Sequence, residues 1–304
     1  MSWKDVLSFV FFLLVVGLLV FYWFLPLDEI EFGFSSPGHT NFTLNSSNEE
    51  NMQFYPNLRY SEARISYRIE ACTLQKEDDM RSAFKVIEDK TVLDFYEVSS
   101  NEQILVTCES GTKFQGEFFI AGEGGPTEIT QAGDFNVIEK GGIVLIRDSN
   151  CENPNVAIHE LLHALGFDHS QNPENIMYEV SRCNQEIGQD TLNLIDELYS
   201  IESLPDLLFE DASASMSGRY LDVSMTIRNN GLIESGMSKV LVYADGDLIK
   251  ELDVEEIPIG SGKIITMTNI LVLQSSVSDL RLSIDYSQRE LKKGNNEITL
   301  KIKN

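Results

Sequence analysis

Three of the four histidines of this 304-residue chain lie in one short stretch, VAIHELLHALGFDHS at positions 156–170. His159 and His163 are four residues apart, so on a helix their imidazoles lie one above the other on a single face. This spacing suits two ligands of one zinc ion, and Glu160 beside them can reach a water that the ion activates. The stretch therefore predicts a hydrolytic zinc site on a helix.

Gly166 follows His163 by three residues and predicts how a third ligand arrives. A glycine can adopt a positive φ, which ends a helix and turns the chain back. His169 then becomes the third ligand and leaves a fourth position open for water or substrate.

Other acidic side chains near the motif are alternatives for the third ligand. Glu179 or Glu186, both downstream, could supply it from a following segment, but the glycine turn favours His169. Asp168 is interpreted as an exposed turn residue.

HELLHALGFDHS resembles the HExxHxxGxxH signature of the metzincin zinc peptidases, and most of all their matrixin branch. The resemblance covers about residues 58–203 and implies zinc, a protein or peptide substrate, and Glu160 as the general base. It assigns Met177, in Asn175-Ile176-Met177-Tyr178, to the methionine turn beneath the zinc. Tyr178 then either lines the substrate pocket or only packs.

The sequence departs from matrixins in two ways. Residues 26–58 contain no cysteine that could keep the enzyme latent. The glycine-rich segment 122–142, expected to be a loop, carries no visible calcium or structural-zinc ligands. We therefore expect one catalytic zinc; calcium is compatible with the acidic composition, but no motif indicates it.

The N-terminal segment is long and apolar enough to span a bilayer. Val6 to Leu25 runs for 20 residues without a charge and ends in an aromatic cluster rather than a cleavage site. Lys4 precedes the span and acidic residues follow it. We interpret residues 1–27 as an uncleaved transmembrane anchor, with the bulk of the chain outside the cytoplasm.

The formal net charge of −25 and a pI near 4.4 argue against nucleic acid as a partner. The four cysteines lie in the middle of the chain without metal-binding spacing, which predicts two disulfides in an oxidising compartment. Four cysteines allow three connectivities. Because Cys151 and Cys183 flank the histidine stretch, we favour Cys151–Cys183, which leaves Cys72–Cys108.

The rest of the sequence divides into three segments. Residues 28–57, rich in Gly, Ser, Asn and Thr, are interpreted as a flexible tether. Residues 58–203 predict an α+β domain with a mixed twisted sheet and three helices, and its apolar periodicity gives the following elements. Strands are expected at 63–69, 95–98, 103–108, 117–121 and 143–146, and helices at 76–90, at the histidine motif and at 186–201.

Residues 204–304 alternate apolar and polar side chains in about seven short strands, which predicts an all-β immunoglobulin-like sandwich. This segment resembles the cell-adhesion-related domain of bacterial and archaeal surface proteins. The resemblance implies a prokaryotic cell envelope and a cell-surface partner for this domain.

We therefore predict a membrane-anchored, extracytoplasmic zinc endopeptidase. The alternative from another class is a surface binding or adhesion protein with a vestigial zinc site. Glu160 favours the enzyme, because a non-catalytic site needs the histidines but not this carboxylate. Hydrolysis of a non-peptide envelope polymer is a third alternative.

Overall fold

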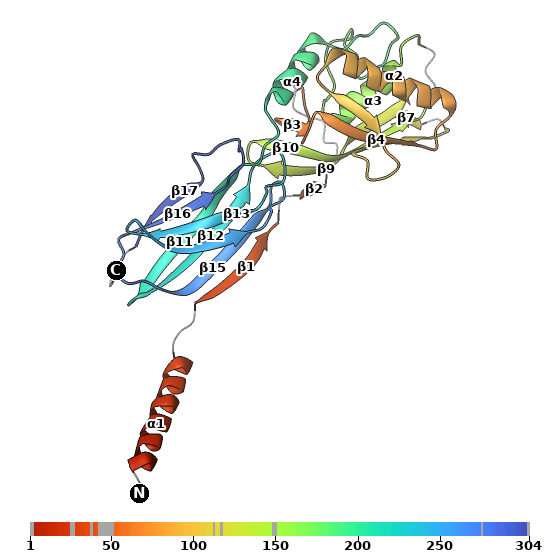
Figure 1. Cartoon of the computed structure of the whole chain (residues 1–304). Coiled ribbons are helices and arrows are strands. Elements are labelled where there is room, and N and C mark those ends of the chain that lie inside the picture. Colours follow the sequence, from red (N-terminus) through yellow and green to blue (C-terminus); the bar gives the residue numbers. More distant parts are fainter. Residues whose placement is uncertain are drawn as a thin grey trace.

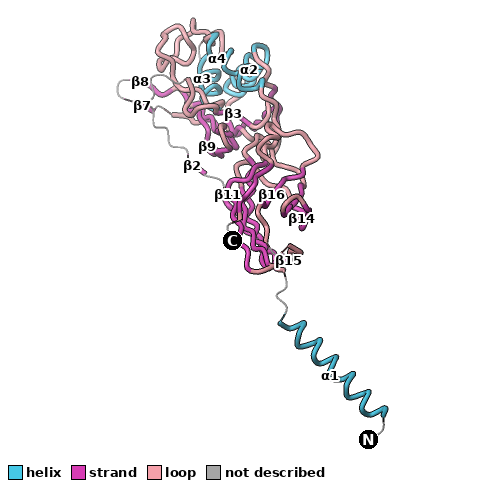
Figure 2. Tube along the Cα trace, turned by 90° about the vertical axis from the view of Figure 1, so that its left-hand side faces the viewer, coloured by secondary structure: helices cyan, strands magenta, loops and turns pink. Residues whose placement is uncertain are grey.

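The computed structural model describes residues 3–24, 28–36, 39–41, 52–111, 113–115, 118–147, 151–274 and 276–302. Figure 1 shows an N-terminal helix, an all-β sandwich and a mixed α/β part at the far end. The described residues form four helices: α1 (Trp3–Phe24), α2 (Leu74–Lys90), α3 (Asn155–Ala164) and α4 (Gln189–Ser200). The last three lie together at the end of the molecule remote from α1 (Figure 2).

The mixed part is built on one sheet of strand order β2-β9-β10-β6-β4-β5, with β3 beside β10. Strands β3, β4, β5, β6 and β10 pair in parallel, whereas β9 is antiparallel to both β10 and β2. The bounds are β2 (His39–Asn41), β3 (Leu58–Tyr60), β4 (Arg64–Glu70), β5 (Asp94–Glu97), β6 (Ile104–Cys108), β9 (Gly122–Ala132) and β10 (Phe135–Leu145); β7 (Lys113–Gln115) and β8 (Phe118–Ile120) form a separate hairpin. The predicted combination of sheet and helices is confirmed.

Helix α2 forms where the periodicity predicts it. The Thr73 side chain accepts a hydrogen bond from the Lys76 N–H at its first turn, as an N-cap does. Met80, Phe84 and Ile87 recur at helical spacing and are buried in the core beneath it. α2 also contacts α3, so its packing helps to fix the helix that carries the histidine motif.

The predicted loop at 122–142 is wrong, because this segment forms the long hairpin β9–β10. Its glycines mark places where another part of the chain comes close. A Cβ on Gly122 would lie 2.6 Å from the Cγ of Glu160, and one on Gly124 would overlap the Glu160 carbonyl oxygen. Glycine thus serves the close approach of α3 to the strand rather than a turn.

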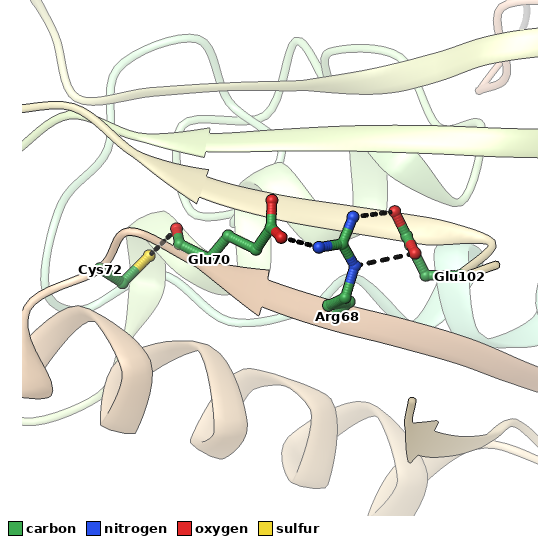
Figure 3. Close-up of polar contacts among 4 residues, drawn as sticks. All are labelled: Arg68, Glu70, Cys72 and Glu102. Carbon is green, nitrogen blue, oxygen red and sulfur yellow. Dashed lines mark hydrogen bonds and ion pairs between the residues drawn. The ribbon is translucent and has the colours of Figure 1, made fainter. Parts of the chain in front are cut away.

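A disulfide closes the sheet near the ends of β4 and β6, where Cys72 bonds to Cys108. Figure 3 shows Arg68 of β4 between the carboxylates of Glu70 and Glu102. The guanidinium donates to Glu102 over 2.9 and 2.7 Å, and this bond lowers the pKa of Glu102 to about 2. The disulfide joins the residues just after β4 to the end of β6, and the bidentate ion pair joins β4 to the segment just before β6.

The C-terminal part consists of two four-stranded sheets, of order β1-β15-β12-β11 and β14-β13-β16-β17. Seven of these strands come from the predicted all-β segment: β11 (Leu207–Ser217), β12 (Tyr220–Asn229), β13 (Ser238–Ala244), β14 (Asp247–Val254), β15 (Gly262–Leu271), β16 (Asp279–Asp285) and β17 (Glu297–Lys301). Inward residues of both sheets, such as Val223 and Val242, are fully buried in one core. The prediction of an all-β segment is confirmed.

The predicted tether at 28–57 is wrong where the structure describes it. Residues Glu29–Ser35 form β1, which pairs antiparallel with β15 and contributes Ile30 to the sandwich. Gln53 is buried and exchanges two hydrogen bonds with the backbone of Leu58. Strand β1 is thus held by a strand far along the chain, and Gln53 also forms an isolated β-bridge with Phe167. The polar composition of the two segments reveals neither partner. Residues 42–51 of the predicted tether lie outside the described residues.

The turn of the β9–β10 hairpin packs against the sandwich. Ala132 and Val137 form a small buried cluster with Leu232. Gly260 has a φ of +65°, and a side chain there would overlap the carbonyl oxygen of Gln131. The hairpin that approaches Glu160 at one end therefore contacts the sandwich at the other.

Helix α1 is the one helix of the described chain that is long and apolar enough to cross a membrane. Its 22 residues span about 33 Å at about 1.5 Å per residue, close to the thickness of a hydrocarbon core. The apolar side chains between Val6 and Val20 are exposed.

Arg59 of β3 joins the start of the mixed part to the end of α4. Its buried guanidinium donates to the carbonyl oxygens of Leu198 and Ile201 and to the hydroxyl of Ser203, and it lies 4.3 Å from the ring centroid of Tyr199. The carbonyls at the C-terminus of a helix carry partial negative charge, so they compensate the buried cation. Burial nevertheless lowers the pKa of Arg59 from its ordinary value.

We expect Arg59→Met to lower the free energy of unfolding by about 2–4 kcal/mol, because it leaves several buried carbonyls without a donor. Arg64→Met is the matched control. Arg64 also lies over a ring, that of Tyr96, but its ion pair with Asp94 is largely exposed. This pair should contribute at most about 1 kcal/mol. Denaturant titration of the detergent-solubilised chain measures both; equal effects would show that Arg59 has no special role.

Candidate metal centre

The three histidines of the motif converge at the C-terminal end of α3. The Nε2 atom of His163 lies 3.0 Å from that of His159 and 3.2 Å from that of His169. Ligands about 2.0–2.1 Å from a tetrahedral zinc ion are about 3.3 Å apart, so the spacing fits that ion. The predicted third histidine thus lies where the glycine turn should bring it.

The turn after α3 explains this convergence. Gly166 has a φ of +98°, its N–H donates to the carbonyl oxygen of His163, and the N–H of Phe167 donates to that of Leu162. These two bonds form a Schellman motif, which ends a helix and reverses the chain. The reversal carries His169 back over the helix end.

Backbone carbonyls fix the orientation of both helical imidazoles. The Nδ1 of His159 lies 2.7 Å from the oxygen of Ile176, and that of His163 lies 2.7 Å from the oxygen of Phe167. A carbonyl only accepts, so each Nδ1 carries the proton and each Nε2 keeps its lone pair for a metal. The donor set therefore fits zinc in its chemistry as well as its spacing.

Burial also keeps the two imidazoles neutral. It lowers the pKa of His159 to about 4 and the pKa of His163 well below its ordinary value. Near neutral pH neither ring has to lose a proton before it binds a metal. His169 is exposed, so the centre opens to solvent on its side.

Glu160 is buried between α3 and strand β9, with its carboxyl group beside Gly122. Burial and the nearby negative charge of Glu123 raise the pKa of Glu160 to about 8. A bound dication would favour the carboxylate and so oppose this shift. Its position on the ligand-bearing helix suits proton transfer.

Met177 lies in the segment that supports His159. It is buried, its N–H donates to the side-chain oxygen of Asn175, and its carbonyl oxygen accepts from the N–H of Ser170. The preceding residue, Ile176, supplies the carbonyl that orients His159. Tyr178 follows and is half-buried, with its N–H donating to the oxygen of Asn175.

The alternative acidic ligands do not join the cluster. Among the described residues, His159, His163 and His169 are the group close enough to share one ion. Glu179 and Glu186 are exposed and lie outside it. Asp168 instead accepts a hydrogen bond from the N–H of His169.

Sequence reasoning missed a second element of the centre, residues 52–54. The ring of Phe54 stacks on that of His163, with centroids 5.7 Å apart. The N–H of Phe54 donates to the oxygen of Gly166, and the N–H of Asp168 donates to that of Met52. The apolar cluster MQFYP was a signal within the presumed tether, but its partner lies more than a hundred residues away.

The second disulfide encloses the centre. Cys151 and Cys183 are bonded as predicted, and they bracket α3, all three histidines and Met177. Inside this loop the buried side-chain amide of Asn155 donates to the carbonyl oxygen of Arg182. The disulfide and this hydrogen bond hold the two ends of the ligand segment together.

Comparisons with known proteins agree with this site. Residues 59–200 match the family model described as Matrixin, and residues 204–300 match the one described as CARDB. Both predicted resemblances are thereby confirmed. The matrixin match spans the three histidines, Glu160 and Met177, and it supports a zinc metallopeptidase-like function.

Among curated proteins, none matches the chain. Similar solved structures include the CARDB domain of a Pyrococcus furiosus protein in complex with di-metal ions, at 20% identity, 33% coverage of this chain, 89% of that chain and a TM-score of 0.28. The same domain in solution is 19% identical, with 33% and 95% coverage and a TM-score of 0.28. A domain of a putative cell surface protein from Methanosarcina acetivorans is 18% identical, with 32% and 88% coverage and a TM-score of 0.27.

We expect Gly124→Ala to disrupt the centre, because its methyl group would overlap the Glu160 carbonyl and push α3 from the sheet. Overpacking of this kind costs about 1–3 kcal/mol. Gly142→Ala is the control, since a Cβ there meets only the Thr127 methyl group, at 3.4 Å. Zinc titration and thermal melting should show weaker binding and lower stability for the first variant alone; two equivalent variants would contradict the close approach.

The raised pKa of Glu160 predicts a pH-dependent stability of the metal-free chain. The folded state keeps a proton that the unfolded chain releases between pH 4.5 and about 8, so the carboxyl destabilises the fold as pH rises through this window. Metal-free Glu160→Gln should therefore melt above the metal-free wild type at pH 8, with the difference vanishing towards pH 4.5. A constant difference across this range would contradict the shift.

Proposed function

We propose that this protein is a membrane-anchored, extracytoplasmic endopeptidase that uses one zinc ion. The observation that carries the proposal is the convergence of the Nε2 atoms of His159, His163 and His169 at the end of α3, the helix that also carries Glu160. The matrixin match over the same residues supports it. Binding alone would need the histidines, whereas a carboxylate at this position is what proton transfer requires.

His159, His163 and His169 would hold the zinc, with two of the rings oriented by backbone carbonyls. When bound, zinc supplies a Lewis acid that polarises the scissile carbonyl and makes water more acidic. Glu160 takes the proton of the attacking water and returns it to the leaving amine. The packing of β9 against α3 holds this carboxyl in place.

Met177 and Tyr178 support the centre in this proposal. Met177, which is buried in the segment whose carbonyl orients His159, would form the methionine turn beneath the ligands. Tyr178 is half-buried in the same segment, and in this proposal it would line the pocket for the residue after the cleaved bond.

The proposed location is the outer face of a prokaryotic cell membrane, with α1 as the anchor. The length and exposure of α1 support insertion into a bilayer, and two disulfides support an oxidising compartment. The CARDB match supports an adhesion-related role for the sandwich. The same match supports an alternative to the peptidase: a surface adhesion protein whose zinc site is vestigial.

Glu160→Gln should keep zinc and fold but reduce peptide cleavage by about 10²–10⁴-fold, because it removes the proton carrier alone. Glu186→Gln, which changes an exposed glutamate near Met177, is the control and should keep both zinc and activity. Wild-type turnover of Glu160→Gln would refute the assignment of this residue as the proton carrier.

Metal analysis of the full chain in detergent should give about one zinc per chain. This zinc should be lost in a His163→Ala, His169→Ala double variant.

A further inference from the structure

The end of the sandwich from which α1 departs carries exposed leucines. Leu271 is 61% and Leu273 86% exposed, and Leu248 in the neighbouring sheet is 46% exposed. The backbone that carries Leu271 and Leu273 is held in place. Val272, between the first two, is buried, and its N–H donates to the carbonyl oxygen of Arg219. The inward position of Val272 holds both flanking leucines outward.

Strand register shows which way this end faces. Strand β15 is antiparallel to β1, and Thr268 pairs with Glu29, the first residue of β1 after the helix. Residues beyond Thr268 therefore continue past the start of β1 on the side of α1, where Figure 1 also shows the helix. Leu271 lies three residues further, which is about 10 Å along a strand.

The chain between α1 and β1 is too short to let this end move far away. Helix α1 ends at Phe24 and β1 begins at Glu29, so at full extension the connection spans about 18 Å. Asp28 also forms an ion pair with Lys250 of β14, which fixes the root of the connection to the second sheet. A helix anchored in a bilayer thus keeps the leucine end at its surface.

The charges at this end do not suggest attraction to anionic lipid. Asp245 accepts from the N–H groups of Ser278 and Asp279, and Asp279 pairs with Lys301. Asp247 accepts from the side chain of Gln274, in the same loop as Leu273. The acidic groups hold the loops in place, which leaves the leucines as the feature that a bilayer would bind.

We propose that Leu248, Leu271 and Leu273 form a tip that docks on the lipid bilayer and holds the sandwich upright. The inference rests on the proposed anchoring by α1 and goes beyond it, since an anchor alone would let the sandwich tilt. Contact is made by apolar insertion at the boundary of headgroups and acyl chains. The catalytic part is then held one sandwich length above the membrane, within reach of extended or protruding substrates.

The test places a polarity-sensitive fluorophore on a cysteine introduced into the full chain, reconstituted in phosphatidylcholine vesicles. The four native cysteines are all in disulfides, so one introduced thiol is labelled selectively. Leu273→Cys probes the tip. Met237→Cys, 69% exposed in the loop before β13 at the opposite end, is the matched control, and Leu13→Cys in α1 reports on the anchor.

The label at position 273 should be quenched by nitroxide-bearing lipid and shielded severalfold from aqueous iodide relative to position 237, with little change at high salt. If position 13 lies in the bilayer but position 273 is as open to iodide as position 237, docking is refuted while anchoring stands. Shielding of position 273 without quenching by lipid nitroxide would reveal a protein contact and also refute it. A label at position 13 outside the bilayer would overturn both proposals.

Discussion

The metal centre depends on a backbone conformation at a single residue, Gly166. Its φ of +98° is costly for any residue with a side chain, and a Cβ there would lie 2.8 Å from the side chain of Leu58. The same turn directs the Phe167 carbonyl to His163 and brings His169 to the two helical ligands. One position therefore governs the orientation of His163, the approach of His169 and the close packing of β3 against the turn.

The parts of this arrangement that are local in sequence could be predicted from it. Imidazoles four residues apart share a helical face, and a glycine three residues later ends the helix. The disulfide Cys151–Cys183 could be inferred because its cysteines flank the same stretch. Helix α2 and the alternating strands of the sandwich follow from apolar periodicity, since each buries one regular face.

The parts that could not be predicted depend on contacts between distant segments. The glycines of β9 indicate a loop by composition, and only the position of α3 shows that they allow Glu160 to approach a strand. Phe54 and strand β1 likewise look like tether residues until His163 and β15 are in place. A polar, glycine-rich composition shows that a segment has no regular apolar periodicity of its own. It does not show that the segment lacks a strand or side chain elsewhere in the sequence to pack against.

The same distant contacts connect the candidate metal centre to the rest of the chain. Hairpin β9–β10 touches Glu160 near Gly124 and packs on Leu232 of the sandwich through Ala132. Strand β1 ties the other end of the sandwich to the residues that follow α1. With α1 anchored as we propose, a tilt of the sandwich would be transmitted to the strand that flanks the Glu160 carboxyl. The sandwich thus contributes to the support of the three-histidine site, and in the proposed arrangement it is more than a spacer between this site and the membrane.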